Sequence, residues 1–175
     1  MFDTLAKERQ SCRSFRKEMP PREVLESILD TAILAPSACN SQPWHLYLVT
    51  DPVAVGGVCE ALQDHKMNPF LSDAPCFVVV TEKMAKLRPG SHLKYSGGHF
   101  VKYDIGEVVA YLTLAAKSHG VESCIIGWIN EEKLRAAVPF PEGESCNIVV
   151  ALGYGENNPL RKKARRPKEE TVTYV

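Results

Sequence analysis

The stretch VKYDIGEVVAYLTLAAKSHG, residues 101–120, decides the fold that the sequence predicts. Its main apolar residues recur at the spacing of one helix face, and they are Ile105, Val108, Val109, Leu112, Ala115 and Ala116. Because Ala110, Tyr111 and Leu114 extend this face nearly round the helix, we expect a long helix over 101–119 that is buried in a core or under a second subunit. Gly120 is a suitable residue to follow its end.

Shorter apolar segments on both sides of this helix indicate a sheet. The predicted strands are 44–50, 76–81, 123–129 and 146–152. The second of these, CFVVVT, is too apolar for a sheet edge. Three other helices are predicted, over residues 20–35, 53–62 and 131–138. The first should end before Pro36, and the pair Gly56 and Gly57 weakens the prediction of the second. Residues 82–100 contain Pro-Gly and Gly-Gly pairs and are expected to be irregular. The mixture favours an α+β sandwich.

The charges are balanced overall but unevenly placed. The 175 residues include 21 Lys or Arg and 21 Asp or Glu, a size and composition that suit one domain. Residues 1–22 carry six basic and three acidic side chains, and residues 161–175 carry six and two. The middle, residues 23–160, carries nine basic and 16 acidic side chains. This balance argues against a general nucleic-acid binder, yet the two basic ends could together form an anion site.

Other broad classes find little support in the sequence. No apolar run is long enough to span a bilayer, and the first ten residues contain no apolar signal core, so we expect a cytoplasmic protein without a membrane segment. The six cysteines are widely spread, and we interpret them as reduced thiols. The Cys and His residues show no spacing typical of a metal site, so no metal is expected.

Three polar segments are candidates for binding. Residues 9–16, RQSCRSFR, alternate cations with hydroxyls, which suits a phosphate or else a solvated basic helix end. The loop APSACNSQPW, residues 35–44, places polar donors on a constrained turn that would suit a polar ring edge, or simply joins a helix to a strand. The basic run 161–168 alone would suit a disordered tail or a weak nucleic-acid patch.

In this order and separation, these segments resemble the FMN-dependent nitroreductase family. The motifs are RQSCRSF, APSACNSQPW, the stretch YDIGEVVAYLTLAAKSHGVESCIIGW and the terminal KARRPKEE, and they are collinear from about residue 9 to residue 170. The resemblance implies an α/β sandwich with a central, mostly antiparallel sheet flanked by helices, in an intertwined homodimer. It also implies one FMN-binding domain over residues 1–175, with residues 156–175 as a C-terminal extension.

The resemblance also implies which residues contact FMN. Arg9, Gln10, Ser11 and Arg13 match the motif that contacts the phosphate and ribityl oxygens, and Lys163 and Arg165 match the basic pair that closes on the phosphate. Pro36, Ser37, Ala38, Asn40 and Gln42 match the loop that reaches the flavin of the other subunit. Ile126 and Gly127 match the pair whose backbone lies near flavin N5. Either Lys66 or Asn68 would contact the pyrimidine ring.

The implied activity is that of an FMN-dependent oxidoreductase. NADH or NADPH would reduce the flavin at N5, and a nitroaromatic, quinone or related small aromatic acceptor would then oxidise it in a ping-pong cycle. The chemistry would take place on the flavin, so no catalytic side chain is assigned. The alternative is a non-catalytic flavin-binding or redox-sensing module, which the short chain and the six thiols motivate. The long helical insertions of larger family members are absent from this sequence, so the resemblance does not identify the acceptor.

Overall fold

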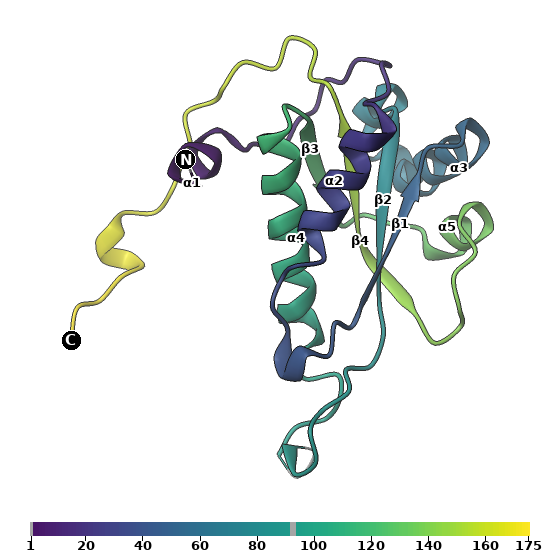
Figure 1. The fold of residues 1–175 in the computed structure, drawn as a ribbon. Helices are drawn as coiled ribbons and strands as arrows, with labels where there is room; N and C mark the ends of the chain where they lie inside the picture. Colours follow the sequence, from purple (N-terminus) through teal and green to yellow (C-terminus); the bar gives the residue numbers. More distant parts are fainter. Residues whose placement is uncertain (1, 92–93) are drawn as a thin grey trace.

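Four antiparallel strands form the central sheet of the protein, whose computed structural model describes residues 2–91 and 94–175 (Figure 1). The strands are β1 Trp44–Val49, β2 Cys76–Glu82, β3 Glu122–Ile126 and β4 Ser145–Gly153. They lie in the order β1, β2, β4, β3. Every neighbouring pair is antiparallel, which confirms the predicted α+β class and antiparallel sheet.

Strand β2 lies in the interior of the sheet and is buried on both faces. Val78 and Val80 belong to the core on one face. Phe77 and Val79 belong to the core on the other, because successive side chains of a strand point in opposite directions. This two-sided burial explains why the run CFVVVT has no polar face, and it confirms the prediction of an interior strand.

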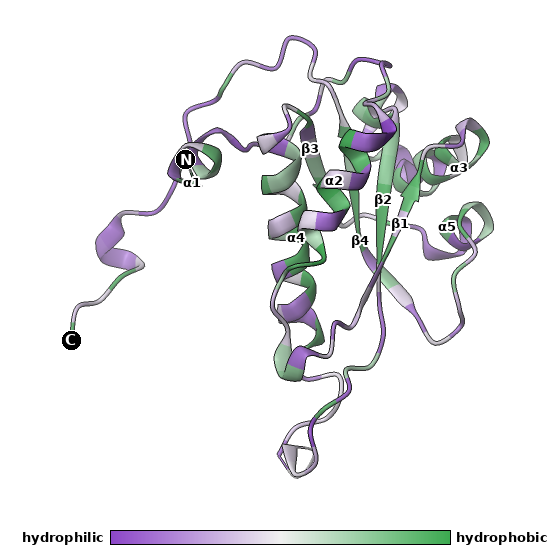
Figure 2. Cartoon of the chain, viewed as in Figure 1, coloured by the Kyte–Doolittle hydropathy of each residue, from purple (hydrophilic) through white to green (hydrophobic). Residues whose placement is uncertain are grey.

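Helices cover both faces of this sheet. They are α1 Phe2–Glu8, α2 Arg22–Ala32, α3 Pro52–Leu62, α4 Val101–Ser118 and α5 Glu131–Ala137. Helices α2 and α4 lie side by side on one face, and α3 and α5 cover the other (Figure 1). Figure 2 shows the strands mainly in green and much of the chain beyond β4 in purple, so the apolar residues concentrate in the sandwich and the C-terminal run is polar.

Two predicted elements end earlier in the structure than the sequence suggested. Helix α2 ends at Ala32 rather than Ala35, because the chain then tightens into i→i−3 turns, in which the backbone nitrogen of Leu34 donates to the backbone oxygen of Thr31 at 3.2 Å. Strand β3 ends at Ile126 rather than at 129, because beyond Ile126 the chain leaves β4 and turns toward α3. The indole of Trp128 there donates to the backbone oxygen of Asp64, 2.9 Å away.

Helix α4 is the longest element, as predicted, and its burial is one-sided within this chain. The side chains of Val108 and Leu112 are fully buried against the sheet, whereas Tyr103 and Tyr111 on the outer side are exposed. Gly120 follows the helix with a φ of +72°, the left-handed conformation expected of a glycine at this position. On the outer side, Tyr111 and Leu114 lie beside Phe2 and Leu5 of α1, which leave Tyr111 38% exposed. Burial of this side is therefore incomplete within the described chain, and its burial under a second subunit stays a prediction.

The sequence analysis missed helix α1 and correctly expected no regular structure between β2 and α4. Helix α1 is only seven residues long and buries none of them, so it leaves little periodic signal. The described residues 83–91 and 94–100 form no strand. Residues 92–93 of the predicted irregular stretch lie outside the described residues.

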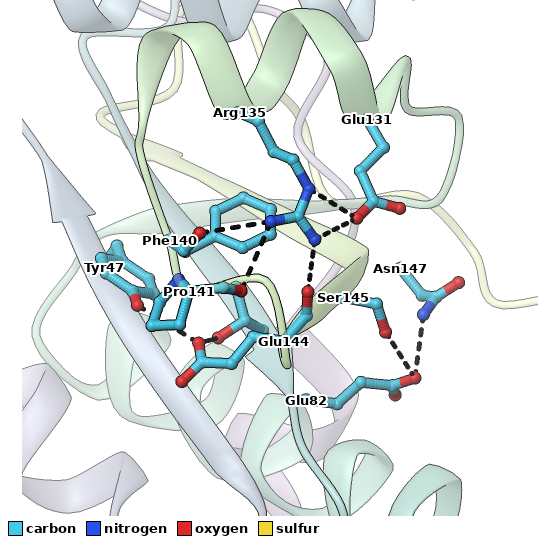
Figure 3. Close-up of polar contacts among 10 residues, drawn as sticks. Tyr47, Glu82, Glu131, Arg135, Phe140, Pro141, Glu144, Ser145 and Asn147 are labelled. Atoms are coloured by element: carbon cyan, nitrogen blue, oxygen red, sulfur yellow. Dashed lines mark hydrogen bonds and ion pairs between the residues drawn. The ribbon is translucent and has the colours of Figure 1, made fainter.

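An arginine on α5 fixes the loop that leads into β4 (Figure 3). The Arg135 guanidinium donates to the backbone oxygen of Phe140 at 3.2 Å and to that of Glu144, and it pairs with Glu131 at 2.7 Å. The buried Glu144 carboxylate accepts hydrogen bonds from the hydroxyls of Tyr47 and Thr81 on β1 and β2. Burial and this carboxylate raise the pKa of the Tyr47 phenol. The start of β4 is therefore held by polar contacts to three neighbouring elements.

The close packing of α3 on α5 generates a prediction about two adjacent glycines. A Cβ on Gly57 would lie 2.7 Å from the Cβ of Ala137, whereas a Cβ on Gly56 would have no neighbour within 4 Å. Gly57→Ala should therefore lower the free energy of unfolding by about 1–3 kcal/mol. The matched control Gly56→Ala should raise it by up to about 1 kcal/mol, because alanine is the better helix former. Chemical denaturation of both variants measures this, and equal stability of the two would contradict the packing described.

Candidate functional site

A basic pocket lies where the N-terminal segment meets the C-terminal run. Its volume is about 340 Å³; Arg9, Gln10 and Ser11 line one wall, and residues 161–165 line the other. The structure thus brings together five of the residues that the sequence analysis assigned to the FMN phosphate and ribityl chain, which are Arg9, Gln10, Ser11, Lys163 and Arg165.

Hydrogen bonds between the two walls hold the pocket together. The Gln10 amide nitrogen donates to the backbone oxygen of Pro159 at 3.0 Å, and its oxygen accepts from the backbone nitrogen of Arg161 at 3.0 Å. The Arg161 guanidinium donates to the backbone oxygen of Ser11, and the Lys163 ammonium donates to that of Arg9. Gln10 is buried and uses both ends of its amide in these contacts. It therefore joins the two walls in this structure.

The pocket carries unneutralised positive charge. Desolvation, followed by repulsion from Arg9, Arg165 and Arg161, lowers the pKa of the Lys163 ammonium. Within the described part of the chain, no acidic side chain forms an ion pair with any of these four cations. An anion with several oxygens would relieve the repulsion and accept charge-assisted hydrogen bonds. This donor set therefore fits a phosphate group.

Arg13 belongs to the same segment but not to the wall of the pocket. The segment runs beside β3, where the backbone nitrogen of Cys12 donates to the backbone oxygen of Ser123 at 2.9 Å. The Arg13 side chain is exposed. Burial raises the pKa of the Cys124 thiol in β3, and the positive charge of Arg13 acts in the opposite direction. The Arg13 guanidinium therefore lies near β3. Arg13 therefore lies further along the sheet edge than the pocket itself.

Strand β3 runs from its contact with this segment, at Ser123, to Ile126 and Gly127, the pair predicted to lie near flavin N5. Ile126 is buried in the core, and Gly127 is exposed directly after the strand. A Cβ on Gly127 would meet only the backbone oxygen of Asn147, at 3.9 Å. The Asn147 side chain is in turn held at 3.0 Å by Glu82, which also accepts from Ser145 (Figure 3). The surface in front of Gly127 is thus open to the close approach of a ring system.

The predicted polar loop, residues 36–42, folds on itself in an unusual backbone conformation. Cys39, Asn40 and Gln42 all have positive φ, between 45° and 55°. The Ser37 hydroxyl accepts from the backbone nitrogen of Gln42 at 3.0 Å, and the Gln42 amide donates to the side-chain oxygen of Asn40 at 3.1 Å. Non-glycine residues rarely adopt this conformation, and several in succession are typical of loops that the surrounding structure holds in place.

Asp104 on α4 holds this loop, and the sequence analysis did not assign it to the site. Its Oδ1 accepts a hydrogen bond from the backbone nitrogen of Ala38 at 3.0 Å. The Asp104 side chain is buried, and its Oδ2 has no hydrogen-bond partner among the described residues. The contact joins residues 66 positions apart, so no local pattern in the sequence could have identified it.

The loop and the basic pocket lie at opposite ends of α4 (Figure 1). Asp104, in the first turn of α4, holds the loop. At the other end, the chain leaves α4 after Ser118 and enters β3, where Ser123 pairs with Ser11 of the pocket segment. A helix of 18 residues is about 27 Å long. The loop and the pocket of one chain are therefore separated by about the length of this helix.

The structure also distinguishes the two candidates that precede β2. The Asn68 amide donates to the backbone oxygen of Leu62 at 3.0 Å, so its nitrogen is occupied within the chain. Lys66 is exposed and forms no ion pair with another described residue. Its neighbour His65 packs edge-on against Trp128, with ring centroids 6.2 Å apart. The Lys66 segment therefore lies beside the end of β3, near Gly127.

Other kinds of site receive no support from the described residues. No helix within residues 2–91 and 94–175 combines the length and hydropathy needed to cross a membrane. Over the same ranges, no group of three or more His, Cys, Asp and Glu side chains is arranged to hold a metal ion. All six cysteines carry free thiols.

Comparison with known proteins identifies the family. The chain is 27% identical over 195 residues to an iodotyrosine deiodinase of Thermotoga neapolitana, covering 98% of this chain and 96% of the relative. It is 28% identical to an NADH dehydrogenase of Thermus thermophilus, covering 86% and 85%. A solved structure of oxidized iodotyrosine deiodinase, bound to FMN and 3-iodo-L-tyrosine, superposes with a TM-score of 0.77 at 26% identity over 100% and 99% of the two chains. The Nitroreductase family model matches residues 6–68 and 56–154, and this chain therefore belongs to the nitroreductase family.

Proposed function

We propose that the protein is an FMN-dependent oxidoreductase that functions as a homodimer with two equivalent sites. The observation that carries this proposal is the basic pocket, in which Arg9, Arg161, Lys163 and Arg165 have no acidic partner among the described residues. Family membership and the FMN complex of a relative support the choice of FMN over another phosphate ligand.

Each part of the site would have a separate task. The basic pocket would hold the FMN phosphate, and Ser11 and Arg13 would contact the ribityl chain. Gly127 and the backbone of Ile126 would lie against the ring, where the missing side chain permits close approach. Lys66, whose ammonium forms no ion pair or hydrogen bond with another described residue, is the better candidate for the pyrimidine edge. Its positive charge would favour negative charge there. FMN would supply the redox chemistry, with NADH or NADPH as donor and a small aromatic as acceptor.

The separation of the two site elements supports a two-fold dimer. A loop held at one end of α4, a helix about 27 Å long, is too far from a pocket beyond the other end to contact the same phosphate group, but it can serve the site of a second copy. The outer side of α4 offers an apolar surface of suitable character, where Tyr111 lies beside Phe2 and Leu5 of α1. The Phe2 side chain is 65% exposed in the single chain. We infer that these residues are covered by the second subunit.

The first experiment tests FMN binding and turnover together. Protein purified gently and reconstituted with FMN should remain yellow after desalting, and NADH or NADPH should bleach the flavin absorbance under anaerobic conditions. Adding a nitroaromatic or quinone should then restore the colour and give steady turnover. Because relatives include deiodinases, a halogenated tyrosine belongs in the acceptor screen. Colourless protein would contradict the proposal, and firmly bound FMN without turnover would favour a flavin-binding sensor.

A second experiment tests the role of the basic pocket. Arg165 lines the pocket, whereas the adjacent Arg166 is exposed and does not. Arg165→Gln should weaken FMN binding by about tenfold or more, because a hydrogen bond to a charged group contributes about 1.5–3 kcal/mol. Arg166→Gln should leave the dissociation constant nearly unchanged. Riboflavin, which lacks the phosphate, should bind both variants like the original protein, and an equal loss of riboflavin affinity would argue against a phosphate contact.

A third experiment tests whether Asp104 holds the loop for binding. Asp104→Leu leaves the half-buried Ala38 N–H without its charged acceptor, a hydrogen bond that contributes about 1.5–3 kcal/mol, and should lower FMN affinity about tenfold. Asp104→Asn keeps the accepting oxygen and should restore most of the affinity. Glu23→Gln, an exposed acid on the neighbouring helix α2, is the control. If Asp104→Leu retains its melting temperature and its FMN affinity, the loop does not depend on this contact.

A further inference from the structure

The segment between β2 and α4, together with the first two residues of α4, is a region of concentrated positive charge. Residues 83–102 carry five cations and no acidic side chain; the five are Lys83, Lys86, Arg88, Lys94 and Lys102. The whole middle of the chain, residues 23–160, has only nine basic residues, so more than half of them lie here. Outside this segment the middle has four basic and 16 acidic side chains. We call the described residues 83–91 and 94–102 the basic strap.

The basic strap has two arms, residues 83–91 and 94–102, which are joined at its base. The backbone nitrogen of Ala85 donates to the backbone oxygen of Gly97 at 3.0 Å. A Cβ on Gly97 would lie 2.9 Å from the Ala85 oxygen, so glycine permits this close approach. Figure 1 shows the strap projecting from the end of the molecule at which β2 ends and α4 begins. The strap therefore carries its cations on a segment that extends beyond the sandwich.

Most of these cations are unpaired. Lys102 pairs with Glu82 at the base. Lys83, Lys86, Arg88 and Lys94 are exposed, and none forms an ion pair with another described residue. Like charges this concentrated repel one another, and a bound anion would reduce that repulsion.

The second arm of the basic strap adds aromatic surface to this charge. The rings of Tyr95, His99 and Phe100 pack together with centroids 4.5–5.0 Å apart. The His99 ring is also 6.5 Å from that of Tyr103 in α4, whose side chain is 68% exposed. The Lys94 ammonium lies 5.3 Å from the centroid of the Tyr95 ring. Exposed rings beside unpaired cations suit a ligand that is both planar and negatively charged.

The strap is attached to the loop half of the candidate site. The backbone nitrogen of Lys83 donates to the backbone oxygen of Pro43 at 2.9 Å, directly after the loop of residues 36–42. Lys102 at the other arm reaches Glu82, which also holds Asn147 behind Gly127. The strap therefore shares one end of the molecule with the elements assigned to the ring of FMN.

We propose that the basic strap binds the anionic group of a planar aromatic reactant and so selects negatively charged reactants at the flavin. This proposal rests on the proposed function, because it names the class of molecule that reacts at the same site. The reactant is a small molecule rather than a nucleic acid. Outside the strap, residues 23–160 carry 16 acidic and four basic side chains, and these would repel a long polyanion. Two reactants share this chemistry: an aromatic carboxylate acceptor, and NADPH with its additional phosphate.

The experiment uses the FMN-loaded protein and pairs of reactants that differ in charge. In the oxidative half-reaction, 4-nitrobenzoate is compared with the neutral 4-nitrobenzamide; in the reductive half-reaction, NADPH is compared with NADH. Rapid-mixing absorbance gives each rate at low and at high salt. The strap variant is Lys86→Gln with Arg88→Gln and Lys94→Gln.

A control variant removes the same charge elsewhere. It carries Lys7→Gln, Lys17→Gln and Lys168→Gln, three exposed residues outside the strap and the pocket. The original protein and this control should favour the charged member of at least one pair by about tenfold, and high salt should reduce that preference. The strap variant should lose the preference while it retains bound FMN.

The outcomes separate the two proposals. A lost preference in the nitro pair identifies the acceptor as the strap's ligand, and a lost preference in the dinucleotide pair identifies NADPH. The strap proposal is overturned if the protein binds FMN and is reduced but shows no charge preference. It is also overturned if the strap variant keeps that preference. Both outcomes leave the proposed function intact. Failure to bind FMN at all overturns the proposed function, and the strap proposal with it.

Discussion

The rigid length of α4 is the constraint on which the rest of the structure depends. Its inner face is buried against the sheet, so the helix cannot bend to bring its ends together. Asp104 holds the polar loop at one end, and the basic pocket forms beyond the other. A chain built in this way has two separated parts of a site. The apolar outer side of α4, which includes Tyr111, supplies a reason for two chains to associate, and a two-fold axis would then place each loop against the other chain's pocket.

Charge placement gives these parts their chemistry. The overall balance of 21 basic and 21 acidic residues conceals two concentrations of cations, one in the pocket and one on the basic strap. In the pocket, desolvation and then repulsion from the neighbouring arginines lower the pKa of Lys163. The acidic body between them would repel a polyanion but not a small phosphate held by focused contacts. If both proposals hold, a protein of zero net charge would bind small anions at two distinct places.

The fold was largely predictable because its signals are local. The interior strand β2 and the long helix α4 show their periodicity within about 20 residues, and both were correctly expected. Long-range contacts were not predictable. Gln10 meets Arg161 across 151 positions, and Asp104 meets Ala38 across 66. The positive φ of Cys39 also follows from tertiary contacts, because its residue type gives no reason for that conformation. The site residues themselves were named through the family resemblance, and their contact with FMN is still a prediction.

Mixing two defective chains tests the central claim most directly. One chain carries Arg165→Glu, which disables the pocket, and the other carries Asp104→Leu, which releases the loop. If each site combines the pocket of one chain with the loop of the other, random exchange of subunits gives one intact site in half of the dimers, or about a quarter of all sites. FMN titration of the refolded mixture should recover that fraction of tight binding. A mixture that binds no better than the average of the two variants would contradict a site shared between subunits.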